Sequence, residues 1–245
     1  MGRRRIICAM GLSRGWTNTV DNGVANASWD AYDATIQTEV QVYNTRFAGS
    51  GYTAVDWKLC KAILWVESGG PTSPAWTKRV MQIGNPGDPA YGTLKGGGST
   101  VSLIVSTSLA SDLQHKSIDD PQLNIRAAIA FLFLRMAQFE DKSVIDPAET
   151  ADHTYTVVPG DNLSAIGRKV GTTVEVLKAM NPGADKMIKP GQVLKYRKAA
   201  VRTVIVGWRA FNTANIAQRY NGNGDPNYAE KLNYVLDLFT KLKRP

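Results

Sequence analysis

The stretch YTVVPGDNLSAIGRKVGTTVEVLKAMNPGADKMIKPGQVLKY, residues 155–196, carries the pattern of a complete small folding unit. It opens and closes on short alternating runs, at 155–158 and 193–196, that are typical of strands. Between them, apolar residues recur at helical spacing in two runs separated by Gly171, a residue suited to end a helix in the left-handed conformation. We therefore expect a β-α-α-β unit of about 42 residues.

Both expected helices of this unit have capping residues at their starts. Asp161 follows a Pro-Gly turn and is expected to be the N-cap of the first helix. Thr172 and Glu175 have the spacing of a capping box, which predicts the start of the second helix.

The same stretch resembles the LysM family in three segments: YTVxPGDxLSxI at 155–166, VxxLKxxNP at 174–182 and IKPGQxL at 188–194. Modules of that family bind glycan chains containing N-acetylglucosamine in a shallow groove between two loops. The resemblance implies a groove formed by Gly160, Asp161, Asn162, Leu163, Asn181, Pro182, Met187 and Ile188.

The charge of the chain favours an anionic partner. The net charge is +8, and residues 154–198 hold eight Lys and Arg against three Asp and Glu. No dense basic tract with interleaved aromatic residues occurs, so we do not expect nucleic acid as a partner. No run of 18 apolar residues occurs, so we do not expect membrane insertion. An acidic cell wall is the remaining anionic partner; the alternative is a basic face that is only solvated.

A second informative pattern precedes the module and ends at Glu67. Apolar residues repeat at helical spacing from Val55 to Val66, with Thr53 as the expected cap, and Gly69 stops the pattern. Glu67 therefore falls in the last turn of a mostly buried helix. Burial raises the pKa of a carboxyl group and keeps it protonated near neutral pH, as a general acid for glycosidic cleavage requires.

Three short segments follow Glu67-Ser68 along the chain: Met81-Gln82, Asn124-Ile125 and Tyr220-Asn221. In order and residue type, the set resembles the soluble lytic transglycosylases, whose fold is lysozyme-like. The resemblance covers about residues 50–140 and 205–240.

The sequence departs from that family at three places. Arg79-Val80 stands where Gly-Leu is usual, residues 84–88 replace the usual Pro-x-Thr, and Arg219 replaces Ala before Tyr-Asn. These differences concern the sugar contacts and not Glu67.

The resemblance implies that Glu67 protonates the glycosidic oxygen between N-acetylmuramic acid and N-acetylglucosamine. Glu67 would then take a proton from the muramic C6 hydroxyl, which closes a 1,6-anhydro ring. Tyr220 would hydrogen-bond the Glu67 carboxyl or the sugar. The implied substrate-binding residues are Ser68, Met81, Gln82, Tyr220 and Asn221.

These patterns predict a mainly α fold in which a lysozyme-like catalytic domain contains an inserted LysM module. The expected division is an N-terminal arm at 1–30, catalytic parts at 31–152 and 199–245, and the module at 153–198.

Further elements are expected around these motifs. Asp120-Pro121 should open a core helix that is apolar on most sides. The remaining expectations are helices at 31–47, 208–220 and 226–242, short helices in an irregular segment at 71–118, and linkers at 141–153 and 198–207.

Three alternatives to the transglycosylase remain open. A hydrolytic muramidase would need a second carboxylate, for which Asp88 and Asp225 are candidates. A cysteine amidase would pair Cys60 with His115 or His153. A non-catalytic wall-binding protein would need neither.

No cofactor or metal is expected, because the two histidines lack zinc-ligand spacing. The apolar run at residues 6–12 is short for a signal peptide. We therefore expect synthesis in the bacterial cytoplasm, with action in a periplasm or cell wall after specialised secretion or lysis. A type VI-like antibacterial toxin would have a secretion apparatus and a cognate immunity protein as partners, whereas a phage lysin would not.

Overall fold

The computed structural model describes residues 11–49 and 51–241. The chain divides into two compact units, which we call the helical unit (Met1–Gln138 with Ile205–Pro245) and the module unit (Phe139–Val204). Cys8 and most of the short apolar run lie outside the described residues.

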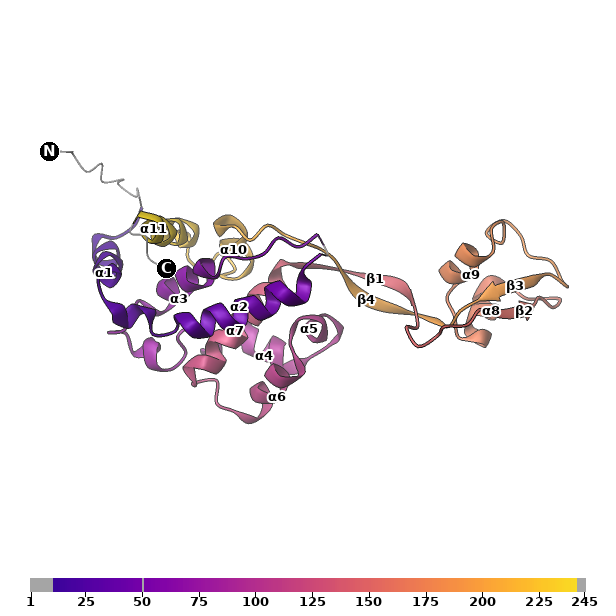
Figure 1. The fold of residues 1–245 in the computed structure, drawn as a ribbon, viewed down its shortest axis with the longest axis horizontal. Coiled ribbons are helices and arrows are strands. Elements are labelled where there is room, and N and C mark those ends of the chain that lie inside the picture. The colour runs from indigo at the N-terminus through magenta and orange to yellow at the C-terminus, as the bar shows by residue number, and fades with distance from the viewer. Residues whose placement is uncertain (1–10, 50, 242–245) are drawn as a thin grey trace. The chain divides into compact units, whose positions relative to one another are not determined.

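The described chain is mainly α (Figure 1). The helical unit contains α1 (Arg14–Val24), η1 (Ala27–Asp30), α2 (Asp33–Phe47), α3 (Trp57–Ser68), η2 (Pro74–Thr77), α4 (Pro89–Gly96), α5 (Ser99–Ile104), α6 (Thr107–His115), α7 (Pro121–Met136), α10 (Thr213–Arg219) and α11 (Tyr228–Lys241). No helix within the described ranges combines the length and apolarity needed to cross a membrane.

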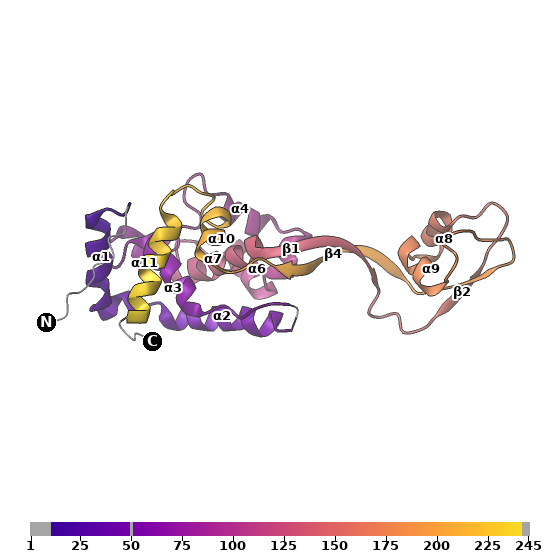
Figure 2. The same cartoon turned by 90° about the horizontal axis from the view of Figure 1, so that it is seen from above.

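Helices α3 and α7 form the centre of the helical unit. Most side chains of both are buried, because each helix is apolar on nearly all sides. Helix α2 packs against both of them, and α11 lies against α3 in both views (Figures 1 and 2). The predicted core helix at α7 is confirmed, with Asp120 as its N-cap and Pro121 in its first turn.

The start of α3 differs from the sequence prediction. Its N-cap is Asp56, which accepts a hydrogen bond from Lys58 N–H at 3.0 Å, and not Thr53. Both residue types can cap a helix, so local sequence does not choose between neighbouring positions. The end is as expected: Gly69 adopts the left-handed conformation, with φ 68°.

The segment expected to be an arm contains α1 and η1 over the residues described. Trp29 is buried against Trp65, with ring centroids 4.5 Å apart. Gly70 permits this approach, because a Cβ there would overlap the Trp29 ring. The buried Lys61 ammonium also pairs with Asp30 at 2.7 Å. These contacts fasten the N-terminal segment to α3.

Two segments expected to be linkers contain paired strands instead. Strand β1 (Ala137–Ile145) pairs with β4 (Ala199–Trp208) in a two-stranded sheet. Where the pair ends, Asp146 N–H donates to Lys198 C=O at 2.9 Å. The chain therefore leaves the helical unit and returns to it along two hydrogen-bonded strands.

The β-α-α-β prediction for the module is confirmed by β2 (His153–Thr156), α8 (Leu163–Val170), α9 (Val174–Met180) and β3 (Val193–Tyr196). Strands β2 and β3 are antiparallel, with Thr156 opposite Val193. A small core holds the unit together: Val157, Ile166, Leu177, Ala184 and Leu194.

Both predicted caps in the module are one residue early. Asn162, not Asp161, caps α8 by accepting from Ala165 N–H at 2.9 Å. Thr173, not Thr172, caps α9. The Thr172 hydroxyl instead donates to Arg197 C=O at 2.5 Å, a contact across 25 residues of sequence.

Candidate active site and glycan-binding module

Glu67 lies in the last turn of α3, at the wall of a cavity of about 190 Å³. The cavity collects residues from four separate parts of the chain. Its lining includes Met81, Gln82, Tyr220 and Asn221, four of the five residues implied to surround Glu67. Tertiary structure thus brings these sequence motifs together in one place.

The environment of Glu67 suits an acid that holds its proton near neutral pH. The pKa of its carboxyl group is raised from 4.5 to about 7, first by burial and then by the negative charges of Asp88 and Asp225. A hydrogen bond donated by the Tyr228 hydroxyl, at 2.5 Å, opposes the shift, as does the charge of Lys231.

Tyr228 was not among the residues singled out from the sequence. It begins α11 and is 2% exposed. The buried positions of α11 (Tyr228, Leu232, Val235 and Phe239) recur at helical spacing, so the sequence could have shown that Tyr228 faces inward. Nothing local shows that it meets Glu67.

Tyr220 makes a different contact from the one implied. Its hydroxyl lies 3.5 Å from Met81 C=O, a long hydrogen bond, and it is Tyr228 that binds the Glu67 carboxyl. The Tyr220 ring lines the cavity and packs against Phe131, with centroids 5.9 Å apart.

The loop that carries Met81 and Gln82 is fastened by Asn124 of α7. The buried Asn124 amide accepts from Met81 N–H at 2.9 Å and donates to Ile83 C=O at 2.9 Å and to Ile118 C=O at 3.2 Å. Gln82 adopts a left-handed backbone conformation, φ 62°, that is costly for a residue with a side chain. The loop is therefore held against strain beside Glu67.

Ser68 does not line the cavity. Its buried hydroxyl donates to Leu64 C=O at 2.7 Å and accepts from Gly70 N–H at 3.2 Å. Both contacts stabilise the end of α3, directly after Glu67.

The two candidate second carboxylates are both bound within the protein. Asp88 caps α4, accepting from Ala90 N–H at 2.9 Å and from Gly84 N–H at 2.6 Å. Asp225 pairs with Lys231 at 2.6 Å. Burial alone would raise the pKa of Asp225, but the hydrogen bonds from Lys231 and Asn227 N–H, with the charge of Lys231, outweigh it and lower that pKa.

Cys60 is unsuited to nucleophilic chemistry. It is fully buried, and burial raises the pKa of its thiol to about 12. The two candidate partners have other contacts: the ring of His115 contacts Ser111 C=O at 2.8 Å, and His153, in the module unit, lies 3.0 Å from Glu149.

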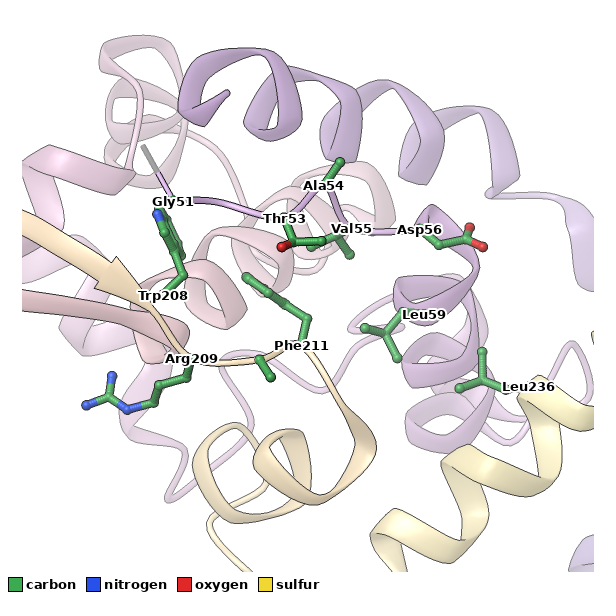
Figure 3. A pocket seen from close by; sticks show the side chains of 11 residues that line it. Gly51, Thr53, Ala54, Val55, Asp56, Leu59, Trp208, Arg209, Phe211 and Leu236 are labelled. Atoms are coloured by element: carbon green, nitrogen blue, oxygen red, sulfur yellow. The ribbon is translucent and has the colours of Figure 1, made fainter. Parts of the chain in front are cut away.

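A larger cavity, of about 390 Å³, lies at the opposite end of α3 (Figure 3). Its lining is mostly apolar; the Phe211 ring reaches toward Thr53, and the Arg209 guanidinium points away. Its one carboxylate, Asp56, caps α3. The carboxyl group with the raised pKa, Glu67, therefore lines the smaller cavity and not this one.

In the module, several residues of the implied groove already serve the fold. The Asp161 carboxylate accepts from Tyr155 O–H and Val158 N–H, both at 2.9 Å. The Asn181 side chain donates to Leu177 C=O at 2.8 Å and accepts from Lys195 N–H at 2.8 Å.

The other groove residues divide by exposure. Leu163 and Ile188 pack partly against the module core. Gly160, Asn162, Pro182 and Met187 are exposed, with Met187 at 63%. These four exposed residues are therefore the members of the implied groove that a ligand can reach.

Comparison with known families gives one match: residues 155–196 match the LysM domain, a peptidoglycan-binding module. No curated protein and no solved structure matches the chain. The module therefore indicates peptidoglycan as a partner and a cell-wall-related place of action.

Proposed function

We propose that this chain is a lytic transglycosylase with a lysozyme-like catalytic unit, which cleaves peptidoglycan glycan strands as an antibacterial effector or lysin. The observation that carries the proposal is Glu67, a buried carboxyl group with a pKa near 7 at the wall of a cavity. The LysM module supports the choice of substrate, because it binds the polymer to be cut.

In the proposed reaction, Glu67 donates its proton to the bridging oxygen as the bond between muramic C1 and that oxygen breaks. The resulting Glu67 carboxylate accepts the proton of the muramic C6 hydroxyl, whose oxygen bonds to C1. The Tyr228 hydroxyl stabilises the carboxylate between these steps by hydrogen bonding. Atoms balance without water, and Glu67 ends protonated.

The hydrogen bonds already made by the carboxylates of Asp88 and Asp225 favour this reaction, which uses one acid, over hydrolysis. Asp88 is occupied by two backbone N–H groups and Asp225 by Lys231 and Asn227 N–H. A hydrolytic muramidase commonly uses a second free carboxylate as base or nucleophile.

Product analysis tests the proposal directly. Purified sacculi digested by the protein should release muropeptides that end in 1,6-anhydro-muramic acid, detected by mass spectrometry as products lighter by one water. In ¹⁸O-labelled water these products should carry no label. Reducing-end muramic acid carrying ¹⁸O would show a hydrolase, and no cleavage at all would leave the chain a wall-binding protein.

Tyr228→Phe should move the pH dependence of cleavage upward. The reaction needs protonated Glu67, so activity falls as pH rises through its pKa of about 7. The Tyr228 hydrogen bond lowers that pKa, so its loss raises the pKa and shifts the basic limb to higher pH. The measurement is kcat/KM on soluble glycan strands across pH 5–9.

Tyr220→Phe is the matched control, since its hydroxyl contacts Met81 C=O and not Glu67. That variant should keep the basic limb of wild type. If kcat/KM of Tyr228→Phe fell at the same pH as that of wild type, the assignment of Glu67 as the acid would be contradicted.

A further inference from the structure

A further cavity, of about 300 Å³, adjoins the one at Glu67 and is called the second cavity below. The two have Gln82 as a common wall residue. The other walls of the second cavity come from η2 and the loops around it, including Lys78, Arg79 and Asn85. A substrate bound at Glu67 can therefore extend past Gln82 into a further, larger space.

The wall between the two cavities is held in a fixed conformation. Gln82 has left-handed φ, and its backbone N–H donates to Arg79 C=O at 2.8 Å. Its side-chain oxygen accepts from the Asn85 amide. Backbone strain that the surrounding structure maintains is typical of functional positions, and here it places Gln82 between the two spaces.

The two cations of the second cavity differ in whether they have hydrogen-bond and ion-pair partners. Arg79 has two partners within the protein: its Nε donates to Asp119 at 2.7 Å and its Nη1 donates to Gly84 C=O at 2.6 Å. Lys78 is exposed, and its ammonium has no hydrogen bond or ion pair within residues 11–49 and 51–241. Since Asp119 is paired with Arg79, Lys78 is the cation left to meet a ligand.

The charge changes sign along this path. The lining of the cavity at Glu67 contains the Asp88 carboxylate and no cation among the described residues, while nearby Asp225 is paired with Lys231, so an anion is disfavoured there. Lys78 favours one in the adjoining space. A ligand that matches both has an uncharged sugar backbone and an acidic branch.

We propose that the cavity at Lys78 is a subsite for the acidic peptide stem of the substrate, with the Lys78 ammonium pairing with a free stem carboxylate. This rests on the proposed function, because the stem is carried by the muramic acid whose bond is cut. Two wall residues of this cavity, Arg79 and Asn85, lie where the sequence departs from the transglycosylase pattern, and Lys78 directly precedes Arg79. The subsite is thus a specificity feature of this chain.

The test compares one batch of sacculi in two forms: with free stem carboxylates, and with those carboxylates converted to primary amides by carbodiimide and ammonium. Wild type should cleave the free-acid form about five-fold faster, as expected for a solvent-accessible ion pair. Lys78→Met should lose this preference and retain wild-type activity on the amidated form. Lys95→Met, an equal charge change on the exposed face of α4 outside both cavities, should keep the preference.

Because the module is the same in all variants, its own response to amidation cancels in the comparison. A wild-type preference in Lys78→Met would overturn the subsite while leaving the proposed function intact. An equal fall on both forms would also overturn it, since Lys78 would then be contacting the sugar. Absence of cleavage by wild type would refute the proposed function and the subsite together.

Discussion

Glu67→Gln is expected to reduce cleavage of glycan strands by about a thousand-fold, the effect of losing a general acid and base. Glutamine has nearly the same shape, and its amide oxygen can still accept the hydrogen bond that Tyr228 donates at 2.5 Å. It has no transferable proton, so the reaction loses both proton steps and the fold keeps its contact. Release of soluble muropeptides from sacculi measures the loss.

The same variant should bind sacculi as wild type does, because the module that matches LysM is untouched. The complementary variant replaces residues 147–197 with Asn-Gly. Asp146 N–H already bonds Lys198 C=O, so the two-residue turn can close β1 and β4 into a hairpin. That variant should cleave soluble strands and co-sediment poorly with sacculi. Cleavage retained by Glu67→Gln would mean that another group is the acid.

Asn124→Ala is expected to lower the free energy of unfolding by roughly 3 kcal/mol, because it leaves buried polar groups without partners. Met81 N–H and the carbonyls of Ile83 and Ile118 lose their bonds to the amide. Thermal unfolding should show a midpoint lower by roughly 10 °C for a unit of this size. At temperatures below this midpoint, where the variant is still folded, cleavage should also be slower than in wild type, because the loop that carries Gln82 loses its hydrogen bonds to Asn124.

Gln122→Ala is the control on the same helix. Gln122 is exposed on α7, so this change should alter stability by less than about 0.5 kcal/mol. If Asn124→Ala unfolded within two degrees of that control, the three hydrogen bonds would not be what holds the loop.

In the module, local sequence predicts nearly all of the secondary structure. Its strands, helices and the left-handed Gly171 all follow from patterns within 155–196, because its core forms from contacts inside that stretch. The caps are the exception. Asp161 and Asn162 are both good caps. Asn162 caps α8 because the Asp161 carboxylate already accepts hydrogen bonds from Tyr155 O–H and Val158 N–H.

At the candidate site, local sequence predicts the burial of Glu67 but not its hydrogen-bond partner. The apolar pattern of α3 predicted that Glu67 is buried, and its pKa of about 7 agrees with that expectation. The Tyr228 hydroxyl that binds it lies 161 residues away in sequence. A hydrogen bond over that separation depends on how α11 packs on α3, which no periodicity encodes.

Residue patterns alone predict the module, the two central helices and the buried position of Glu67, because each depends on interactions within a helix or a short segment. Three features become visible only in the folded chain: the pairing of β1 with β4, the contacts that hold α1 and η1, and the partners of Glu67, Tyr220 and Asn124. Polar side chains and short strands can be satisfied by many partners. Which partner each one meets is fixed only when the apolar faces of the helices have packed together.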